Sequence, residues 1–186
     1  IYNTLMNGSY GEVLTIVEFV CVWLCEKKYG LVDPTIPYVI ELNSVFEREY
    51  VCYRMIDGKI VAISDPVEKE EIEESLEIGF QGTKSHIKKA LGFLADREHR
   101  DYKNCIKESI SAVESICEII VDNKKATLGA ALKILENKGI NLHPALKKSF
   151  SSLYGYTSDE GGIRHAEGLL ESNVTFEEAK YMLVSC

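Results

Sequence analysis

The stretch GYTSDEGGIRHAEG, residues 155–168, contains the pair of residues with the clearest chemical potential in this chain, Arg164 and His165. A guanidinium is a strong donor to anions, and an imidazole can both donate and accept hydrogen bonds. Two roles follow from these residue types. The pair could bind an anion at the N-terminus of the helix that this stretch opens, or it could form structural bonds to Glu108 or Glu114. The structural role is the one we predict.

The residues around this pair predict the start of a helix. Thr157 and Glu160 have the spacing of a capping box, and Thr175 and Glu178 repeat it before the last helix. Two adjacent glycines at 161–162 are not needed for capping, and each costs roughly 1 kcal/mol relative to alanine inside a helix. Their presence favours a close approach of another backbone or of a ligand.

A second set of residues could contact single-stranded RNA by stacking and by charge: Lys147, Lys148, Tyr154 and Tyr156. Tyrosines near helix ends are more often half-buried packing residues. The formal net charge of −8 also argues against a protein that is coated with nucleic acid.

The N-terminal elements predict an α+β portion over residues 1–80. We expect helix through Lys28, with the apolar residues 13–25 buried, and a second helix over 38–49. The period then changes to that of strands, and Asp57-Gly58 predicts a type I′ hairpin over about 50–64. A lone hairpin must lean on helices to be stable.

Everything after Pro66 has helical periodicity, so the predicted fold class is mostly α, a helical bundle preceded by a small helix-plus-hairpin module. The bundle occupies residues 81–186. Caps, prolines and glycines place its helices, together with the acidic one before it, at 66–78, 83–97, 101–122, 127–138 and 144–155. Residues 175–186 look like a helix interrupted in mid-course, which suggests a fragment of a longer polypeptide.

Composition excludes several classes of protein. No apolar run reaches the roughly 18 residues of a membrane helix, and no signal peptide is present, so we expect a cytoplasmic protein without a membrane partner. The six cysteines form no zinc-type cluster. Because no phosphate-binding loop, dinucleotide fingerprint or metalloprotease motif occurs, we expect no cofactor and no metal.

Two stretches carry a resemblance to a known family. DYKNCIKESISAVESICEII, followed by ATLGAALKILENKGINLHPALKKSFSSLYGYTSDEGGIRHA, resembles the C-terminal helical domain of AbiJ-type bacterial abortive-infection proteins, a member of the HEPN superfamily. The similarity covers about residues 80–186, and LYGYTSDEGGIRHA is its most distinctive motif. The earlier NSVFEREYVCYRMIDGKIVAI resembles the helix-plus-hairpin module that precedes this domain. The resemblance implies a bundle that pairs as a homodimer in phage defence.

The same resemblance implies a test for ribonuclease activity. Many HEPN domains cleave RNA without a metal, through an arginine followed after four to six residues by a histidine that acts as general acid or base. None of the four histidines here has an arginine at that upstream spacing: His86, His99, His143 and His165. Arg164 and His165 are adjacent, so on a helix their side chains point about 100° apart. The nuclease motif is therefore not met.

Three functions stay open on the sequence. The preferred one is a non-catalytic or degenerate HEPN-type interaction or RNA-binding module of an abortive-infection protein, working as a dimer. The second is a divergent ribonuclease that uses Arg164 and His165, supported by Glu108, Tyr154 or Tyr156. The third is a structural adaptor that recognises another protein.

Overall fold

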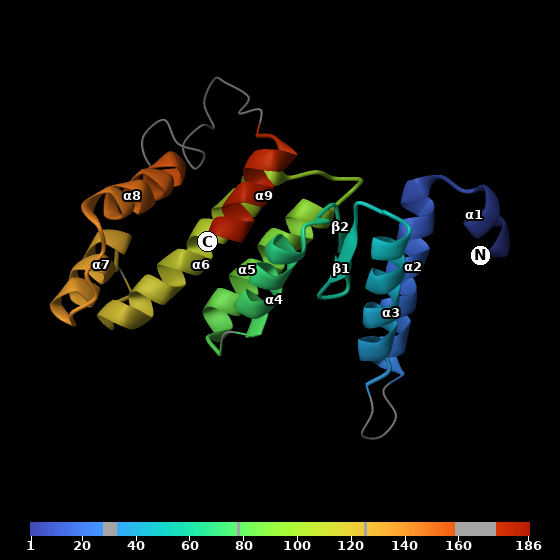
Figure 1. Ribbon diagram of the computed structural model, residues 1–186, viewed down its shortest axis with the longest axis horizontal. Helices are drawn as coiled ribbons and strands as arrows, with labels where there is room; N and C mark the ends of the chain where they lie inside the picture. The colour runs from blue at the N-terminus through green and yellow to red at the C-terminus, as the bar shows by residue number, and fades with distance from the viewer. Residues whose placement is uncertain (28–32, 78, 125, 159–173) are drawn as a thin grey trace. The chain divides into compact units, whose positions relative to one another are not determined.

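The structure is a computed structural model that describes residues 1–27, 33–77, 79–124, 126–158 and 174–186 (Figure 1). It is mostly helical and contains a small antiparallel hairpin, which confirms the predicted fold class. The chain divides into two compact units. Unit 1 comprises residues 1–73 and 95–99, and unit 2 comprises residues 74–94 and 100–186. Each unit is described by itself below.

Unit 1 begins with two helices, where the sequence predicted one. They are α1 (Tyr2–Asn7) and α2 (Tyr10–Glu26), and the break between them is a capping box. The Ser9 hydroxyl accepts from the Glu12 N–H at 3.3 Å, and the Glu12 carboxylate accepts from the Ser9 N–H at 2.7 Å. These bonds satisfy donors that a helix start leaves open, so a new helix begins at Tyr10.

The expectation that residues 13–25 are buried is wrong. Within α2 only Leu14 and Cys21 are buried. Phe19 is 62% exposed, and Val22 and Trp23 are about half exposed. The reason is that α2 packs on α3 (Thr35–Arg48) and on β2 (Lys59–Val61) along one side, and its sequence is apolar on the other side as well.

The hairpin has the predicted turn. Asp57 and Gly58 both have positive φ, 46° and 76°, as a type I′ turn requires. Strand β1 (Arg54–Ile56) pairs with β2 in a register that places Met55 opposite Ile60. Both of these side chains are buried in the core of unit 1, together with Leu14, Cys21 and Phe46.

Side chains from the flanking helices cover both edges of this sheet at the same level. On the β1 edge, Asn43 of α3 accepts from the Met55 N–H at 2.8 Å and donates to the Met55 carbonyl at 3.0 Å. On the β2 edge, Glu18 of α2 accepts from the Ile60 N–H at 2.7 Å, and Arg97 donates to the Ile60 carbonyl at 3.3 Å. The exposed edges of a lone hairpin are thereby occupied.

Unit 2 consists of the end of α4 (Pro66–Glu77) and five further helices of the described chain: α5 (Gln81–Ala95), α6 (Tyr102–Val121), α7 (Leu128–Asn137), α8 (Pro144–Ser158) and α9 (Phe176–Ser185). Helix α6 contacts α7, α8 and α9 (Figure 1). Its buried residues therefore extend beyond the predicted stripe of Ile106, Ile110 and Cys117 to a neighbouring face that includes Cys105 and Ala112.

Most helix boundaries of unit 2 follow the predicted signals. Thr127 caps α7, Gly139 has a φ of 88° after it, and Thr175 with Glu178 forms the predicted capping box of α9. One prediction is wrong. Helix α8 does not end at Gly155 but at Ser158, and Thr157 lies inside its last turn, where its hydroxyl donates to the Tyr154 carbonyl at 2.9 Å.

Thr157 is therefore no helix N-cap, because its hydroxyl is used within α8. Its predicted partner Glu160 lies outside the described residues. In the part of the chain that the structure describes, no helix combines the length and the apolar character that a bilayer crossing needs.

Candidate functional site

The predicted pair Arg164 and His165 lies outside the residues that the structure describes, and so do the glycines 161–162. The predicted bonds from this pair to Glu108 or Glu114 therefore stay predictions. The two carboxylates themselves are described, and each has a partner elsewhere in unit 2.

Glu108 of α6 is bonded to His86 of α5. The His86 Nδ1 lies 2.7 Å from a Glu108 oxygen, and the Lys89 Nζ lies 4.0 Å from that same oxygen. The two side chains are 31% and 25% exposed. A carboxylate on one ring nitrogen fixes the orientation of an imidazole, which is useful in catalysis and equally useful in joining two helices. The sequence analysis did not select His86, because the two residues lie on different helices and no motif connects them.

Glu114 of α6 is bonded to Tyr154 of α8. The Tyr154 hydroxyl donates to the Glu114 carboxylate at 2.8 Å, and both groups are partly buried. This bond joins the long central helix to α8 across the bundle. Tyr154 is thus a packing residue with a satisfied polar end, which is the alternative that the sequence left open for it.

The predicted RNA surface is divided by further bonds of this kind. Lys147 donates to both oxygens of Glu136 on α7, at 2.8 and 2.9 Å. Lys148 is exposed, and Tyr156 is 42% exposed, with its hydroxyl 3.4 Å from Glu178. Burial, followed by the nearby Glu178 carboxylate, raises the pKa of Tyr156. Lys148 and Tyr156 are the two members of the set that remain accessible to a ligand.

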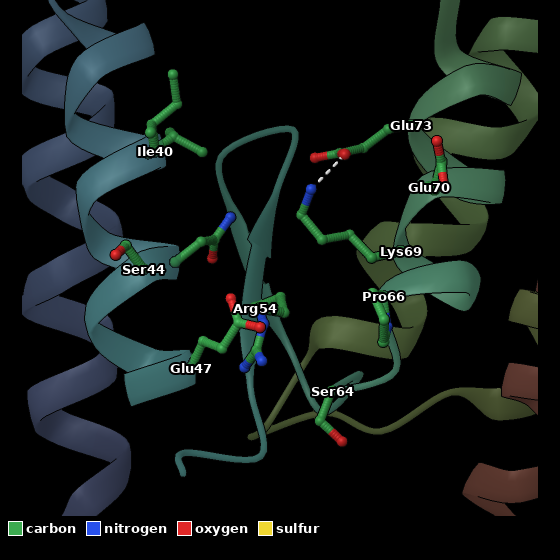
Figure 2. A pocket seen from close by; sticks show the side chains of 11 residues that line it. Ile40, Ser44, Glu47, Arg54, Ser64, Pro66, Lys69, Glu70 and Glu73 are labelled. Carbon is green, nitrogen blue, oxygen red and sulfur yellow. Dashed lines mark hydrogen bonds and ion pairs between the residues drawn. The ribbon is translucent and has the colours of Figure 1, made fainter. Parts of the chain in front are cut away.

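A pocket of about 570 Å³ lies within unit 1, and its lining comes from elements that are distant in the sequence (Figure 2). Helix α3 forms one wall and helix α4 the other, with β1 between them. The polar residues of the lining are Asn43, Ser44, Glu47, Arg54, Ser64, Lys69, Glu70 and Glu73, and Val39, Ile40 and Pro66 add apolar surface.

Arg54 is the most buried charged residue of this pocket, with 9% of its surface exposed. Its Nη1 donates to the Val51 carbonyl at 2.8 Å and to the Tyr53 carbonyl at 2.7 Å. These carbonyls belong to the segment that leads from α3 into the hairpin. The local backbone therefore holds one nitrogen of the guanidinium in place.

The α4 wall supplies the other charges. Lys69 is paired with Glu73 one helical turn later, and Glu70 projects from the exposed surface beside them. On the opposite wall Glu47 of α3 is exposed, and Figure 2 shows it beside Arg54. The pocket thus combines a buried cation with a more acidic opening. Among the described residues no group of three or more His, Cys, Asp or Glu side chains is arranged to hold a metal ion.

Sequence reasoning missed this pocket, since its walls meet only in the folded unit. One signal was present. In YVCYRMI an arginine interrupts a hydrophobic strand pattern, and an arginine at such a position needs hydrogen-bond partners when the strand is buried. The acidic run at 65–77 was visible as well, although a solvated helix surface is the usual explanation of such a run.

The described chain is thus a mainly helical protein that carries a polar pocket beside a hairpin with covered edges. Residues 1–77 match the family model AbiJ N-terminal domain 4, and the match includes every residue that lines the pocket. This supports the AbiJ-type relationship predicted for the helix-plus-hairpin module. The match ends before the bundle, so the HEPN assignment of residues 81–186 stays a prediction. No curated protein and no solved structure matches the chain.

Proposed function

We propose that this chain is a non-catalytic interaction module of an abortive-infection protein, in which a degenerate HEPN-type bundle follows an AbiJ-type N-terminal domain. The match of residues 1–77 to AbiJ N-terminal domain 4 carries the proposal, because it connects the chain to proteins of phage defence. We further propose that the protein works in the cytoplasm as a homodimer.

The bonds of unit 2 support the non-catalytic role. Supporting groups for a ribonuclease built on Arg164 and His165 were expected at Glu108, Tyr154 and Tyr156. Glu108 is engaged by His86, and Tyr154 by Glu114. A group that already bridges two helices must break that bond before it can take part in proton transfer, which costs about 1 kcal/mol or more.

The first experiment compares the intact protein with an Arg164→Ala/His165→Ala double variant in two assays. One assay incubates each protein with tRNA, and the other challenges cells that express each protein with phage. We expect intact tRNA with both proteins and equal protection by both. Cleavage and protection that are both lost in the double variant would establish the ribonuclease instead. An unchanged plating efficiency with either protein would contradict the defence role.

RNA binding without cleavage has its own structural basis, which is the accessible part of α8. Lys148 and Tyr156 lie eight residues apart on this helix, so they share one side of it, and the helix contains no acidic residue. A phosphate contact and a stacking platform are the two parts that single-stranded RNA requires.

A Lys148→Ala/Tyr156→Ala variant tests this binding by fluorescence anisotropy with a labelled single-stranded RNA. We expect an affinity loss of about tenfold or more, since stacking is worth about 1–3 kcal/mol per base. The matched control is Lys59→Ala, which removes the same charge from an exposed site in unit 1. Equal binding by all three proteins would remove RNA from the proposal and leave a protein partner, and light scattering of the same samples tests the dimer.

A further inference from the structure

Arg54 lies in the pocket of unit 1 without a carboxylate partner. Among the described residues no ion pair to its guanidinium is present, and both of its hydrogen bonds start from Nη1. Glu47 lies beside it in Figure 2 and belongs to the exposed face of α3, yet the two form no ion pair. The nitrogens Nε and Nη2 therefore remain available on a side chain that is nine-tenths buried.

A buried guanidinium with two open donors favours an anionic ligand. Leaving a buried charge uncompensated costs several kcal/mol, and a planar fork of two N–H groups matches the two oxygens of a carboxylate or phosphate. The backbone carbonyls of Val51 and Tyr53 fix the position of the fork in advance. Less conformational entropy is then lost when the ligand binds.

The remaining charges select among anions. Besides Arg54, the lining carries the carboxylates of Glu47, Glu70 and Glu73 and the ammonium of Lys69, which is already paired with Glu73. A phosphate group or an RNA backbone would bring a larger negative charge towards these carboxylates and be repelled. A single carboxylate on Arg54 combined with a positive group near Glu70 satisfies both ends.

The layout of the pocket sets the order of these groups along the ligand. Figure 2 shows Arg54 and Ser64 towards one end, and Ile40, Glu70 and Glu73 towards the other. A complementary ligand therefore carries its carboxylate at one end and an ammonium with an apolar group at the other. The volume of about 570 Å³ is within the range of small-molecule sites.

We propose that this pocket binds a zwitterionic short peptide, with its C-terminal carboxylate on Nε and Nη2 of Arg54, its N-terminal ammonium at Glu70, and an apolar first side chain against Ile40. The pocket belongs to the N-terminal unit, and the proposal is independent of whether unit 2 binds or cleaves RNA. It gives the unit that matches the AbiJ family model a peptide-sensing site of its own.

The probe is the dipeptide Leu-Gly, titrated into the whole ¹⁵N-labelled protein and followed by the amide resonances of Ser44 and Ser64. We expect saturable shifts at millimolar concentration. N-acetyl-Leu-Gly and the C-terminal amide of Leu-Gly each lack one charge, and each should bind at least about tenfold more weakly, as expected for a charge-assisted hydrogen bond. AMP should bind more weakly than Leu-Gly.

Variants separate recognition from folding. Arg54→Lys keeps the charge and removes the fork, but it also disturbs the bonds to Val51 and Tyr53. Glu70→Gln avoids this difficulty, because Glu70 is exposed and forms no ion pair among the described residues. We expect Glu70→Gln to weaken Leu-Gly binding about tenfold, and to leave unchanged the binding of N-acetyl-Leu-Gly, which has no ammonium.

Glu71→Gln is the matched control, since Glu71 is an exposed neighbour on α4 that does not line the pocket. Any of three results would overturn the proposal: no saturable shift with Leu-Gly, equal affinity for Leu-Gly and its two blocked forms, or tighter binding of AMP. Equal effects of Glu70→Gln and Glu71→Gln would refute the assigned position of the ammonium.

Discussion

The two units use their polar side chains in different ways. In unit 1 they bond to the backbone, as Asn43 does to Met55, Glu18 to Ile60 and Arg54 to Val51. In unit 2 they bond to one another between helices, in pairs that include His86 with Glu108, Lys147 with Glu136 and Tyr154 with Glu114.

The cause of this difference is the secondary structure. An α-helix satisfies its own backbone except at the ends, so side chains on facing helices are free to pair with each other. A two-stranded sheet has two open edges, and buried N–H and C=O groups at those edges need partners. A polar substitution should therefore cost more in unit 1 than in unit 2, where exposed pairs are worth little.

The largest predicted effect concerns thiol reactivity in the core of unit 2. Burial raises the pKa of Cys105 to about 12 from an ordinary value of 9.0. Three pKa units correspond to about a thousandfold less thiolate. At pH 8 we expect iodoacetamide to alkylate Cys105 about a thousandfold more slowly in the folded protein than in urea, as followed by mass spectrometry.

The sign of the linked pH effect follows from the same shift. The raised pKa of Cys105 means that the unfolded state loses its thiol proton first, so this stabilising contribution is complete below pH 9 and disappears as the pH rises towards 12. Cys25 and Cys52 of unit 1 are exposed and provide internal controls. Alkylation of Cys105 as fast as that of these two would show that unit 2 opens readily.

The next effect tests the importance of side-chain-to-backbone bonds in unit 1. Asn43→Ala removes both partners of the fully buried Met55 backbone and should destabilise unit 1 by about 3 kcal/mol. Trp23, the single tryptophan, lies in this unit, so urea unfolding followed by its fluorescence measures the loss. Ser44→Ala is the matched control on the adjacent exposed position. A cost of less than about 1 kcal/mol for Asn43→Ala would break the comparison.

A smaller effect is expected for a side-chain pair in unit 2. Tyr154→Phe removes the hydroxyl that donates to Glu114 and should cost about 1 kcal/mol, a typical value for one partly buried bond. Tyr156→Phe is the control and should cost almost nothing, because its 3.4 Å bond to Glu178 is exposed. Hydrogen exchange of the Ile110 and Ala179 amides reports on unit 2. A loss as large as that of Asn43→Ala would contradict the distinction between the units.

The sequence predicted those features that depend on neighbours along the chain. The positive φ of Asp57 and Gly58, the start of α8 at Pro144 and the buried stripe Ile87, Leu91 and Leu94 of α5 all follow from local rules. The break at Ser9 follows from such a rule as well, since Ser9 and Glu12 form a capping box, yet the apolar periodicity obscured it.

Features that depend on the folded arrangement could not be predicted. The pocket requires α3, β1 and α4 to meet, and nothing in the spacing of Glu47, Arg54 and Glu70 indicates that they share one cavity. The same holds for the bond between His86 and Glu108, which lie 22 residues apart. The exposure of Trp23 was missed because an apolar helix predicts burial without stating how many sides have a neighbour.

The smallest effect concerns how each unit ends its helices. Helix α3 ends in a Schellman motif, with the Val51 N–H donating to the Phe46 carbonyl at 2.7 Å and with Tyr50 in the left-handed region at a φ of 54°. Unit 2 places Asp122 and Gly139 at such positions, and both residue types tolerate this conformation better than tyrosine does.

Tyr50 is 92% exposed, so its ring contributes little packing to offset the backbone strain. We expect Tyr50→Gly to stabilise unit 1 by roughly 0.5–1 kcal/mol, and Asp122→Gly to stabilise unit 2 by only a few tenths of a kcal/mol. Tyr50→Ala keeps the positive φ and should be close to neutral, which separates relief of strain from loss of the ring. If Tyr50→Gly instead destabilises the unit, the ring must make a contact in the assembled protein, and exposed tyrosine at a strained helix end would then indicate a binding surface next to the pocket.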